Sequence, residues 1–166
     1  FSWGARLAGL ALGAYGLALV AGAGLGSTDP LAPIPQLSAQ QRHMAFQRIK
    51  TVADLEREVA AASAAGRPVM LDFYADWCVS CKEMEKYTFT DPDVQSALAN
   101  ALLLQADVTA NDADDQAMLK HFGIFGPPTI AFYGPDGVER RNYRVVGYMK
   151  AVEFAKLSRE AIAATK

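Results

Sequence analysis

The two cysteines of this 166-residue chain, Cys78 and Cys81, are separated by only two residues. They lie in the stretch "DFYADWCVSCKEME", between an apolar run and a segment with helical spacing. A zinc site usually needs four cysteine or histidine ligands, and besides this pair the chain offers only His43 and His121. A structural staple is also a poor interpretation, because closing so short a loop removes little entropy from the unfolded chain. Reversible thiol–disulfide chemistry remains.

The position of the pair along the chain favours this redox chemistry. The stretch "PVMLDFYA", residues 68–75, is apolar apart from Asp72 and predicts a buried central strand. A helix is predicted to begin at the cysteines, and the unpaired N–H groups at a helix start stabilise a thiolate. We therefore expect Cys78 to be the exposed nucleophile. Cys81, one turn further in, is expected to be the resolving thiol that releases the reduced product.

Two carboxylates are expected to tune these thiols. Asp72 is the only charge in its strand, so burial should raise its pKa and let it exchange a proton with the resolving thiol. The alternative is that Asp72 faces solvent at a sheet edge. Glu85 follows Cys81 by four residues and Cys78 by seven, which predicts the same helical face. Its charge opposes the helix dipole, and a less stable thiolate makes a weaker oxidant. The pair is thus predicted to be a reductant.

The rest of the sequence predicts the elements that position this site. A short edge strand at 45–49 precedes a helix at 51–66, whose N-cap is Thr51. After the cysteine helix, a second helix begins at 90–92, and a strand at 101–108 leads into a helix at 111–122. A hairpin of strands 128–133 and 138–146 and a last helix at 149–165 complete the order β-α-β-α-β-α-β-β-α. This order predicts an α/β fold with a mixed central sheet flanked by helices.

A membrane segment is expected ahead of this domain. Residues 7–26 contain no charge, and a helix of this length spans roughly the 30 Å hydrocarbon core of a bilayer. The alternative is a cleaved signal peptide with a small-residue site at 21–23. Three prolines in residues 27–45 predict an extended linker. We thus expect a transmembrane helix at 1–26, a linker at 27–45 and a domain at 46–166. The net charge of −2 argues against nucleic acid as a partner.

The segment "LDFYADWCVSCK" resembles the thioredoxin active site. The segments "EMEKYTFTDPDVQSAL", "LLLQADVTANDADDQAMLKHF" and "GPPTIAFYGPDG" are similar to the C-terminal periplasmic domain of the DsbD family of thiol:disulfide interchange proteins. The resemblance covers about residues 46–165 and implies a thioredoxin fold. In that family the domain follows the last helix of a membrane domain, so we expect this chain to be a piece of a longer protein. Val79 and Ser80 stand where ordinary thioredoxin has Gly-Pro.

The resemblance also implies residues that contact a substrate. Trp77 is expected to lie across the site and shield the sulfur. Pro128, followed by Thr129, matches a proline that is preceded by a cis peptide bond and faces the cysteines. There its backbone would pair with a substrate segment added as a strand. Gly147 matches a glycine that lets the backbone of a partner approach.

The activity that the resemblance implies is that of a protein-disulfide reductase, whose redox group is the Cys78–Cys81 disulfide and which needs no other cofactor and no metal. Electrons would come from a cysteine pair in the membrane domain of the same protein. They would pass to its N-terminal periplasmic domain or to another periplasmic thiol protein, in electron transport that serves cytochrome c maturation. The protein would lie in the bacterial inner membrane, with this domain in the periplasm.

Two alternatives to this relay stay open. The first is a free-standing, membrane-anchored thioredoxin-like protein for cytochrome maturation or oxidative folding. The second is a binding module whose affinity is gated by the redox state of the pair.

Overall fold

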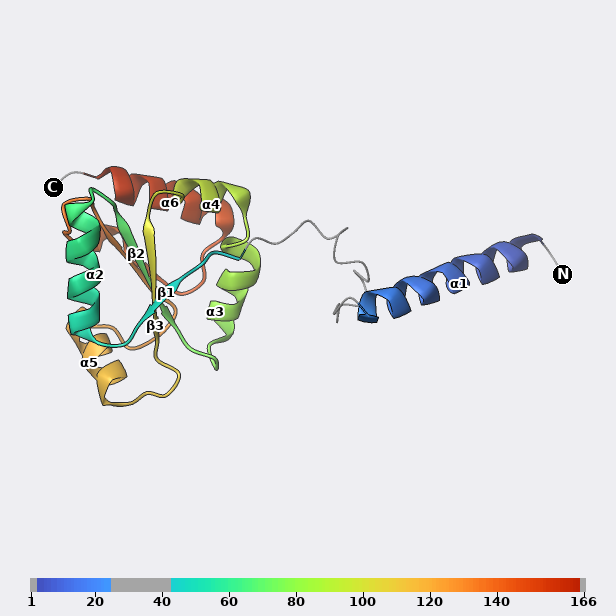
Figure 1. The fold of residues 1–166 in the computed structure, drawn as a ribbon, viewed down its shortest axis with the longest axis horizontal. Helices are drawn as coiled ribbons and strands as arrows, with labels where there is room; N and C mark the ends of the chain where they lie inside the picture. The colour runs from blue at the N-terminus through green and yellow to red at the C-terminus, as the bar shows by residue number, and fades with distance from the viewer. Residues whose placement is uncertain (1–2, 25–42, 165–166) are drawn as a thin grey trace. The chain divides into compact units, whose positions relative to one another are not determined.

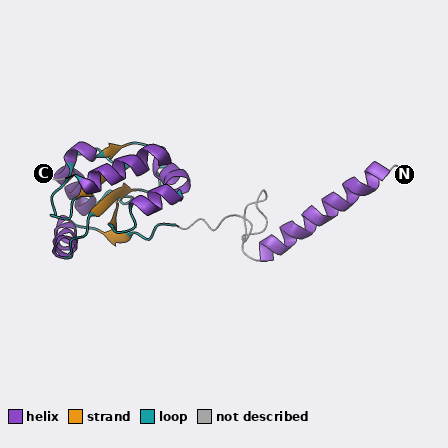
Figure 2. Cartoon of the chain, turned by 90° about the horizontal axis from the view of Figure 1, so that it is seen from above, coloured by secondary structure: helices purple, strands orange, loops and turns teal. Residues whose placement is uncertain are grey.

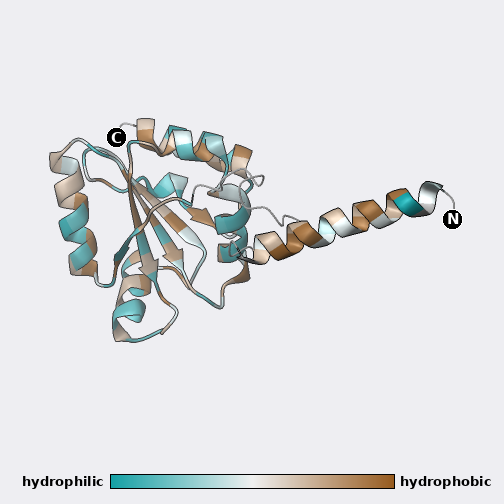
Figure 3. Ribbon diagram, turned by 45° about the vertical axis from the view of Figure 1, so that its right-hand side comes forward, coloured by the Kyte–Doolittle hydropathy of each residue, from teal (hydrophilic) through white to brown (hydrophobic). Residues whose placement is uncertain are grey.

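The computed structural model describes residues 3–24 and 43–164 of the chain, in two units divided after Arg42. The first unit contains helix α1 (Trp3–Gly24) (Figure 1). Residues Arg6–Ala23 are long and apolar enough to cross a membrane, a test that a signal sequence also passes. Figure 3 shows apolar residues along most of this helix. The predicted linker lies outside the described residues up to position 42, and His43 begins the second unit.

The second unit is built on a five-stranded mixed sheet with the order β1-β3-β2-β4-β5. The strands are β1 (Gln47–Ile49), β2 (Val69–Tyr74), β3 (Leu102–Asp107), β4 (Thr129–Tyr133) and β5 (Val145–Val146). β1, β3 and β2 run parallel, whereas β4 pairs antiparallel with β2, and β5 antiparallel with β4. The predicted edge strand β1 and the predicted central, fully buried strand β2 are confirmed.

Helices cover both faces of this sheet, as Figure 1 and Figure 2 show. α2 (Val52–Ala64) and α5 (Ala113–Phe122) pack on one face. On the other face lie α3 (Val79–Glu83), the π-helical turn η1 (Met84–Thr88), α4 (Pro92–Ala97) and α6 (Ala151–Ala163). Strand side chains alternate between the two cores, since successive residues of a strand point to opposite faces. Leu71 and Phe73 enter the first core and Met70 enters the second. This three-layer α/β fold confirms the predicted class.

Two capping boxes fix the starts of the helices on the first face. The Thr51 side chain accepts a hydrogen bond from the Asp54 N–H, and the Asp54 carboxylate accepts one from the Thr51 N–H. Asp112 and Asp115 make the same reciprocal pair at the start of α5. Each box satisfies two backbone donors that a helix start otherwise leaves unpaired. The predicted N-cap at Thr51 is therefore confirmed.

The predicted second strand of the hairpin, residues 138–146, is wrong as one continuous strand. Only Val145–Val146 pairs with β4, while Glu139 makes an isolated bridge and Arg141–Tyr143 forms a 3-10 turn, η2. Charged side chains hold the segment in this shape. Both oxygens of the Glu139 carboxylate accept hydrogen bonds from Arg144, and Arg144 also donates to the Phe122 carbonyl at 2.7 Å. An extended strand would break this bidentate pair.

The cysteine helix also differs from the prediction. A regular α-helix was expected through Glu85, but α3 ends at Glu83 and the chain continues as the π-helical turn η1. The Phe89 N–H donates to the Met84 carbonyl at 2.8 Å, which closes the wider turn. The Thr88 hydroxyl then donates to the Met149 carbonyl at 2.7 Å. Such turns recur near functional sites in proteins.

A buried hydroxyl in α6 allows a test of the packing on this face. Ser158 is fully buried, and its Oγ has no hydrogen-bond partner within the described residues. Because an unsatisfied buried hydroxyl costs about 1–3 kcal/mol, Ser158→Ala should raise the free energy of unfolding by about 1 kcal/mol or more. Urea denaturation of the oxidised chain measures this change. The control is Ser96→Ala on the exposed face of α4, which changes helix propensity alone and should gain no more than about 0.5 kcal/mol. Equal gains in the two variants would contradict the interpretation.

Candidate active site

Cys78 and Cys81 form a disulfide at the start of α3, with their Cα atoms 5.3 Å apart. Cys78 is the N-cap of this helix, and its Sγ accepts a hydrogen bond from the Cys81 N–H at 3.1 Å. The Cys81 Sγ lies 3.9 Å from the Phe73 carbonyl oxygen, against the end of β2. The predicted redox pair at a strand–helix junction is thus present, with the first sulfur at the helix start.

The expectation that Cys78 is openly exposed is wrong for this oxidised form. Cys78 is only 6% exposed and Cys81 only 3%. Both belong to the apolar core on the α2 and α5 side of the sheet. Cys78 keeps the slightly larger exposed fraction of the two, and its role as the nucleophile stays a prediction.

Asp72 lies in the middle of β2, on the sheet face covered by α3, η1, α4 and α6, and is 4% exposed. Burial raises the pKa of its carboxyl from the usual 3.8 to about 7. A hydrogen bond from Gln105 Nε2 to Asp72 Oδ2, at 2.9 Å, opposes this rise. The charge of Glu85 adds to it and that of Arg48 opposes it. Asp72 is therefore a buried carboxyl with a pKa near neutral, and the solvent-facing alternative is excluded.

Glu85 lies in η1 with 38% of its side chain exposed. Its carboxylate reaches within 4.0 Å of Lys82 Nζ, and its charge acts on the buried carboxyl of Asp72. The structure therefore brings the two predicted acids into one electrostatic neighbourhood. The π-helical turn aims Glu85 at the sheet, a detail that α-helical spacing did not anticipate.

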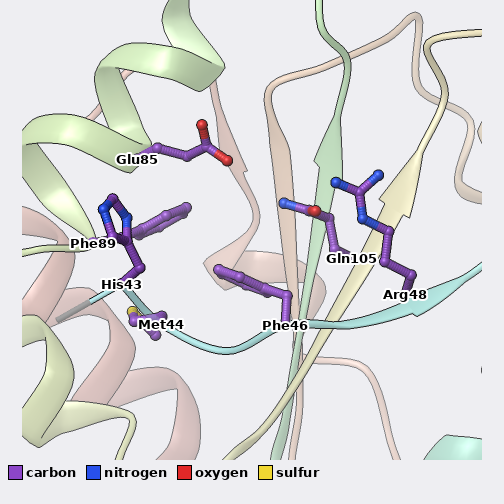
Figure 4. A pocket seen from close by; sticks show the side chains of 7 residues that line it. All are labelled: His43, Met44, Phe46, Arg48, Glu85, Phe89 and Gln105. Atoms are coloured by element: carbon purple, nitrogen blue, oxygen red, sulfur yellow. The ribbon is translucent and has the colours of Figure 1, made fainter. Parts of the chain in front are cut away.

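A cavity of about 210 Å³ lies between η1 and the strands (Figure 4). In Figure 4 Glu85 points into it from the helical side, while Gln105 and Arg48 come from the strand side. His43, Met44, Phe46 and Phe89 complete its lining. Gln105 also donates to Asp72, so one amide side chain both lines the cavity and contacts the buried carboxyl.

Trp77 is 60% exposed, and its Nε1 donates to the Thr109 carbonyl at 3.3 Å. The Asp76 N–H donates to the Thr109 hydroxyl at 2.9 Å and holds the same segment. The indole is thereby attached to the loop after β3 and presents much of its surface to solvent. A contact between Trp77 and a substrate stays a prediction.

The predicted cis peptide bond is present between Pro127 and Pro128. Thr129, which follows, is buried, and its hydroxyl donates to the Gly126 carbonyl at 2.9 Å. In the sheet Thr129 lies opposite Phe73, whose carbonyl contacts the Cys81 sulfur. The register thus puts Pro128 at the same end of the sheet as the disulfide.

Gly147 has a positive φ of 85°, and its N–H donates to the Pro128 carbonyl at 2.9 Å. A Cβ atom built at this glycine would meet no atom within 4 Å. The backbone here is strained for any other residue and open on its outer side. This leaves room for a partner backbone, so the role expected for Gly147 stays a prediction with geometric support.

Sequence reasoning missed Gln105 and Arg48. Gln105 breaks the apolar run "LLLQADV" just as Asp72 breaks its own strand, so the same signal would have found it. Arg48 gave no such signal, because a charged residue on an edge strand is ordinary. Only the register of the sheet shows that Arg48 pairs with Gln105, and Gln105 with Asp72.

Metal binding finds no support at this site. No cluster of three or more His, Cys, Asp or Glu side chains suited to an ion occurs within residues 3–24 and 43–164. His43 lines the cavity beside Glu85, whereas His121 lies near the C-terminal end of α5.

Comparisons with known proteins agree with this geometry. The family described as thioredoxin-like matches residues 50–135. The thiol:disulfide interchange protein DsbD of Ralstonia nicotianae is 46% identical over 164 residues, which is 95% of this chain and 27% of that protein. DsbD of Cronobacter sakazakii is 57% identical over 124 residues, 75% of this chain and 21% of that protein. The chain thus spans about a quarter of the length of the curated relatives it matches, or less.

Solved structures resemble the second unit. The crystal structure of the oxidised C-terminal domain of Neisseria meningitidis DsbD superposes with a TM-score of 0.60 at 37% identity, covering 69% of this chain and 99% of that one. A Thermus thermophilus thioredoxin gives a TM-score of 0.55 at 25% identity, covering 70% of this chain and 87% of that one.

The buried carboxyl predicts a pH-dependent stability. The folded chain holds the Asp72 proton up to about pH 7, while the unfolded chain releases it near pH 4, so stability should fall as pH rises between these values and then level off. At about 1.4 kcal/mol for each pKa unit, the loss approaches about 4 kcal/mol as an upper value. Asp72→Asn stays neutral, so it should be more stable than the parent at pH 8 and similar at pH 4. Urea unfolding of the oxidised chains measures this.

The matched control for this prediction is Asp114→Asn, at an exposed carboxylate on α5. Its stability should follow that of the parent across the range. If Asp72→Asn and the parent lose stability in parallel from pH 4 to pH 8, Asp72 is not the titrating group.

Proposed function

This chain belongs to the DsbD family of thioredoxin-like domains, and from that premise we propose that it is a thiol:disulfide oxidoreductase that reduces a disulfide in a protein partner. The observation that carries the proposal is the placement of Asp72. A carboxyl with a pKa of about 7 lies one residue before Phe73, whose carbonyl contacts the Cys81 sulfur. Asp72 is thus one residue along the chain from the carbonyl that contacts the resolving sulfur, and its exchange of a proton with Cys81 is part of the proposal.

The reaction follows from these positions. In the reduced pair, the Cys78 thiolate attacks one sulfur of the partner disulfide, and the released partner sulfur takes a proton. Cys81 gives its proton to Asp72 and attacks the Cys78 sulfur. The mixed disulfide breaks, the second partner sulfur leaves as a thiolate that takes a proton from water, and the Cys78–Cys81 disulfide forms. Two electrons have then passed to the partner, and a dithiol donor must return them.

The acidic surroundings favour the reducing direction. The dipole of α3 stabilises a thiolate at Cys78, but this helix is only five residues long, and Glu85 in the following turn places a negative charge nearby. Ionised Asp72 adds a second one. Since stabilising the thiolate makes a pair more oxidising, charges that destabilise it make the pair a better electron donor.

We further propose the relay in which this domain acts. Its electron donor would be a cysteine pair in the membrane domain of the same protein, and its acceptor the N-terminal periplasmic domain or another periplasmic thiol protein. Helix α1, which is long and apolar enough to cross a membrane, supports a place in the bacterial inner membrane with the thioredoxin-like unit in the periplasm. Trp77, Pro128, Thr129 and Gly147 would contact the substrate.

Cysteine variants test the reductase activity directly. The full chain in detergent should reduce insulin with dithiothreitol as donor, and both Cys78→Ala and Cys81→Ala should abolish turnover. Cys81→Ala should also accumulate a mixed disulfide with the partner, because nothing resolves it, whereas Cys78→Ala should form none. Gel shift under non-reducing conditions distinguishes the two. Ser80→Ala is the control and should keep its activity. Insulin reduction that persists in either cysteine variant would contradict the mechanism.

The charge of Glu85 should raise the pKa of the Cys78 thiol, so Glu85→Gln should lower that pKa by about half a unit. The ultraviolet absorbance of the thiolate, followed during a pH titration of the reduced chain, measures the shift. Equilibration with glutathione should then show a more oxidising pair. Glu83→Gln is the matched control, because Glu83 is the last residue of α3, two positions before Glu85, and does not line the cavity. Equal shifts of the Cys78 pKa in Glu85→Gln and Glu83→Gln would show that the location of the removed charge does not matter.

A further inference from the structure

Three polar side chains form a row across adjacent strands. Arg48 of β1 lies opposite Gln105 of β3, and Gln105 lies opposite Asp72 of β2. Paired residues of neighbouring strands point to the same face of a sheet. The row continues to Ile130 of β4 and Val145 of β5, which are apolar and belong to the core on that face. The polar half of the row thus leads from the buried carboxyl to the sheet edge.

Arg48 is held at the open end of this row by two contacts. Its guanidinium makes an ion pair with the Asp107 carboxylate at the end of β3. It also lies over the Tyr74 ring, 5.6 Å from the centroid. The Arg48 side chain is 58% exposed, so its removal should not endanger folding. These contacts fix a positive charge beside the cavity and do not bury it.

Glu85 opposes Arg48 across the same cavity (Figure 4). The charged groups around Asp72 are thus Glu85 on η1 and Arg48 on β1. Behind them lie Asp107, paired with Arg48, and Lys82, which is 4.0 Å from Glu85. His43, from the segment before β1, is the remaining titratable side chain of the lining. Asp72 therefore responds to two opposite charges on opposite walls of one cavity.

We propose that Arg48 is a positioning residue of the reductase, whose charge acts along the Arg48–Gln105–Asp72 row against that of Glu85 and sets how readily Asp72 accepts and releases the proton of the resolving thiol. The positive charge favours the ionised carboxylate, which is the form that accepts a proton from Cys81. Glu85 favours the protonated form. The balance of the two keeps Asp72 able both to take the proton and to lose it to water in the cavity.

The proposal rests on the proposed function for its kinetic consequence only, because the proton affinity of Asp72 is measured without any substrate. In the absence of Arg48 a smaller share of Asp72 is ionised at neutral pH. The resolving step, in which Cys81 attacks the mixed disulfide, then needs a higher pH to reach the same rate.

The test follows the Asp72 carboxyl by carbon-13 NMR through a pH titration of the full chain in detergent. Arg48→Gln should move the titration midpoint of Asp72 upward by about half a unit, and Glu85→Gln should move it downward. Arg48→Lys keeps the charge and should leave the midpoint near that of the parent. In rapid-mixing measurements, the pH profile of the resolving step should shift upward with Arg48→Gln and not with Arg48→Lys.

Arg57→Gln is the matched control, since Arg57 is a similarly exposed arginine with an ion pair on α2, on the other face of the sheet. It should leave the Asp72 midpoint unchanged. The proposal is overturned if Arg48→Gln leaves the midpoint at the parent value, or if Arg57→Gln moves it equally. A chain that reduces no insulin would refute the proposed function, while the titration would still decide the role of Arg48.

Discussion

The structure depends on one buried hydrogen bond, from Gln105 to Asp72, in the middle of the sheet. Placing a carboxyl inside an apolar core is costly, and the protein meets that cost by keeping Asp72 protonated up to about pH 7 and by giving it an amide donor. Under the proposed function, the carboxyl has a use that an apolar side chain cannot supply, because proton exchange with the resolving thiol requires a group that titrates near neutral pH.

The surrounding fold brings together the chain segments that carry the sulfurs and the acid. β2 ends beside the disulfide, and the antiparallel strand β4 begins there after the cis peptide bond before Pro128. The π-helical turn after α3 lets Glu85 face the strands. Both arrangements bring chain segments that are far apart in sequence to one end of the sheet. The site therefore needs the whole unit to be folded, since no single segment contains all of its groups.

In the oxidised form, the cysteine pair is more buried than we expect for an accessible nucleophile. With Cys78 only 6% exposed, a partner must approach along the surface formed by exposed residues nearby. The Trp77 ring is attached to Thr109 there, and Gly147 leaves open space on its outer side. Under the proposed function, this surface is where a protein partner would make contact.

The sequence alone predicted most of the elements and the redox-active cysteine pair. The cysteine spacing, the lone charge of Asp72 in an apolar strand and the cap at Thr51 are local signals, because strand and helix periodicity decide them within a few residues. Only the tertiary structure decided which side chains meet. Arg48, Gln105 and Asp72 form a row because of strand order and register, and Cys78 is buried because it packs in a core to which distant strands and helices contribute. One segment alone predicts neither, since both arise from contacts between distant parts of the chain.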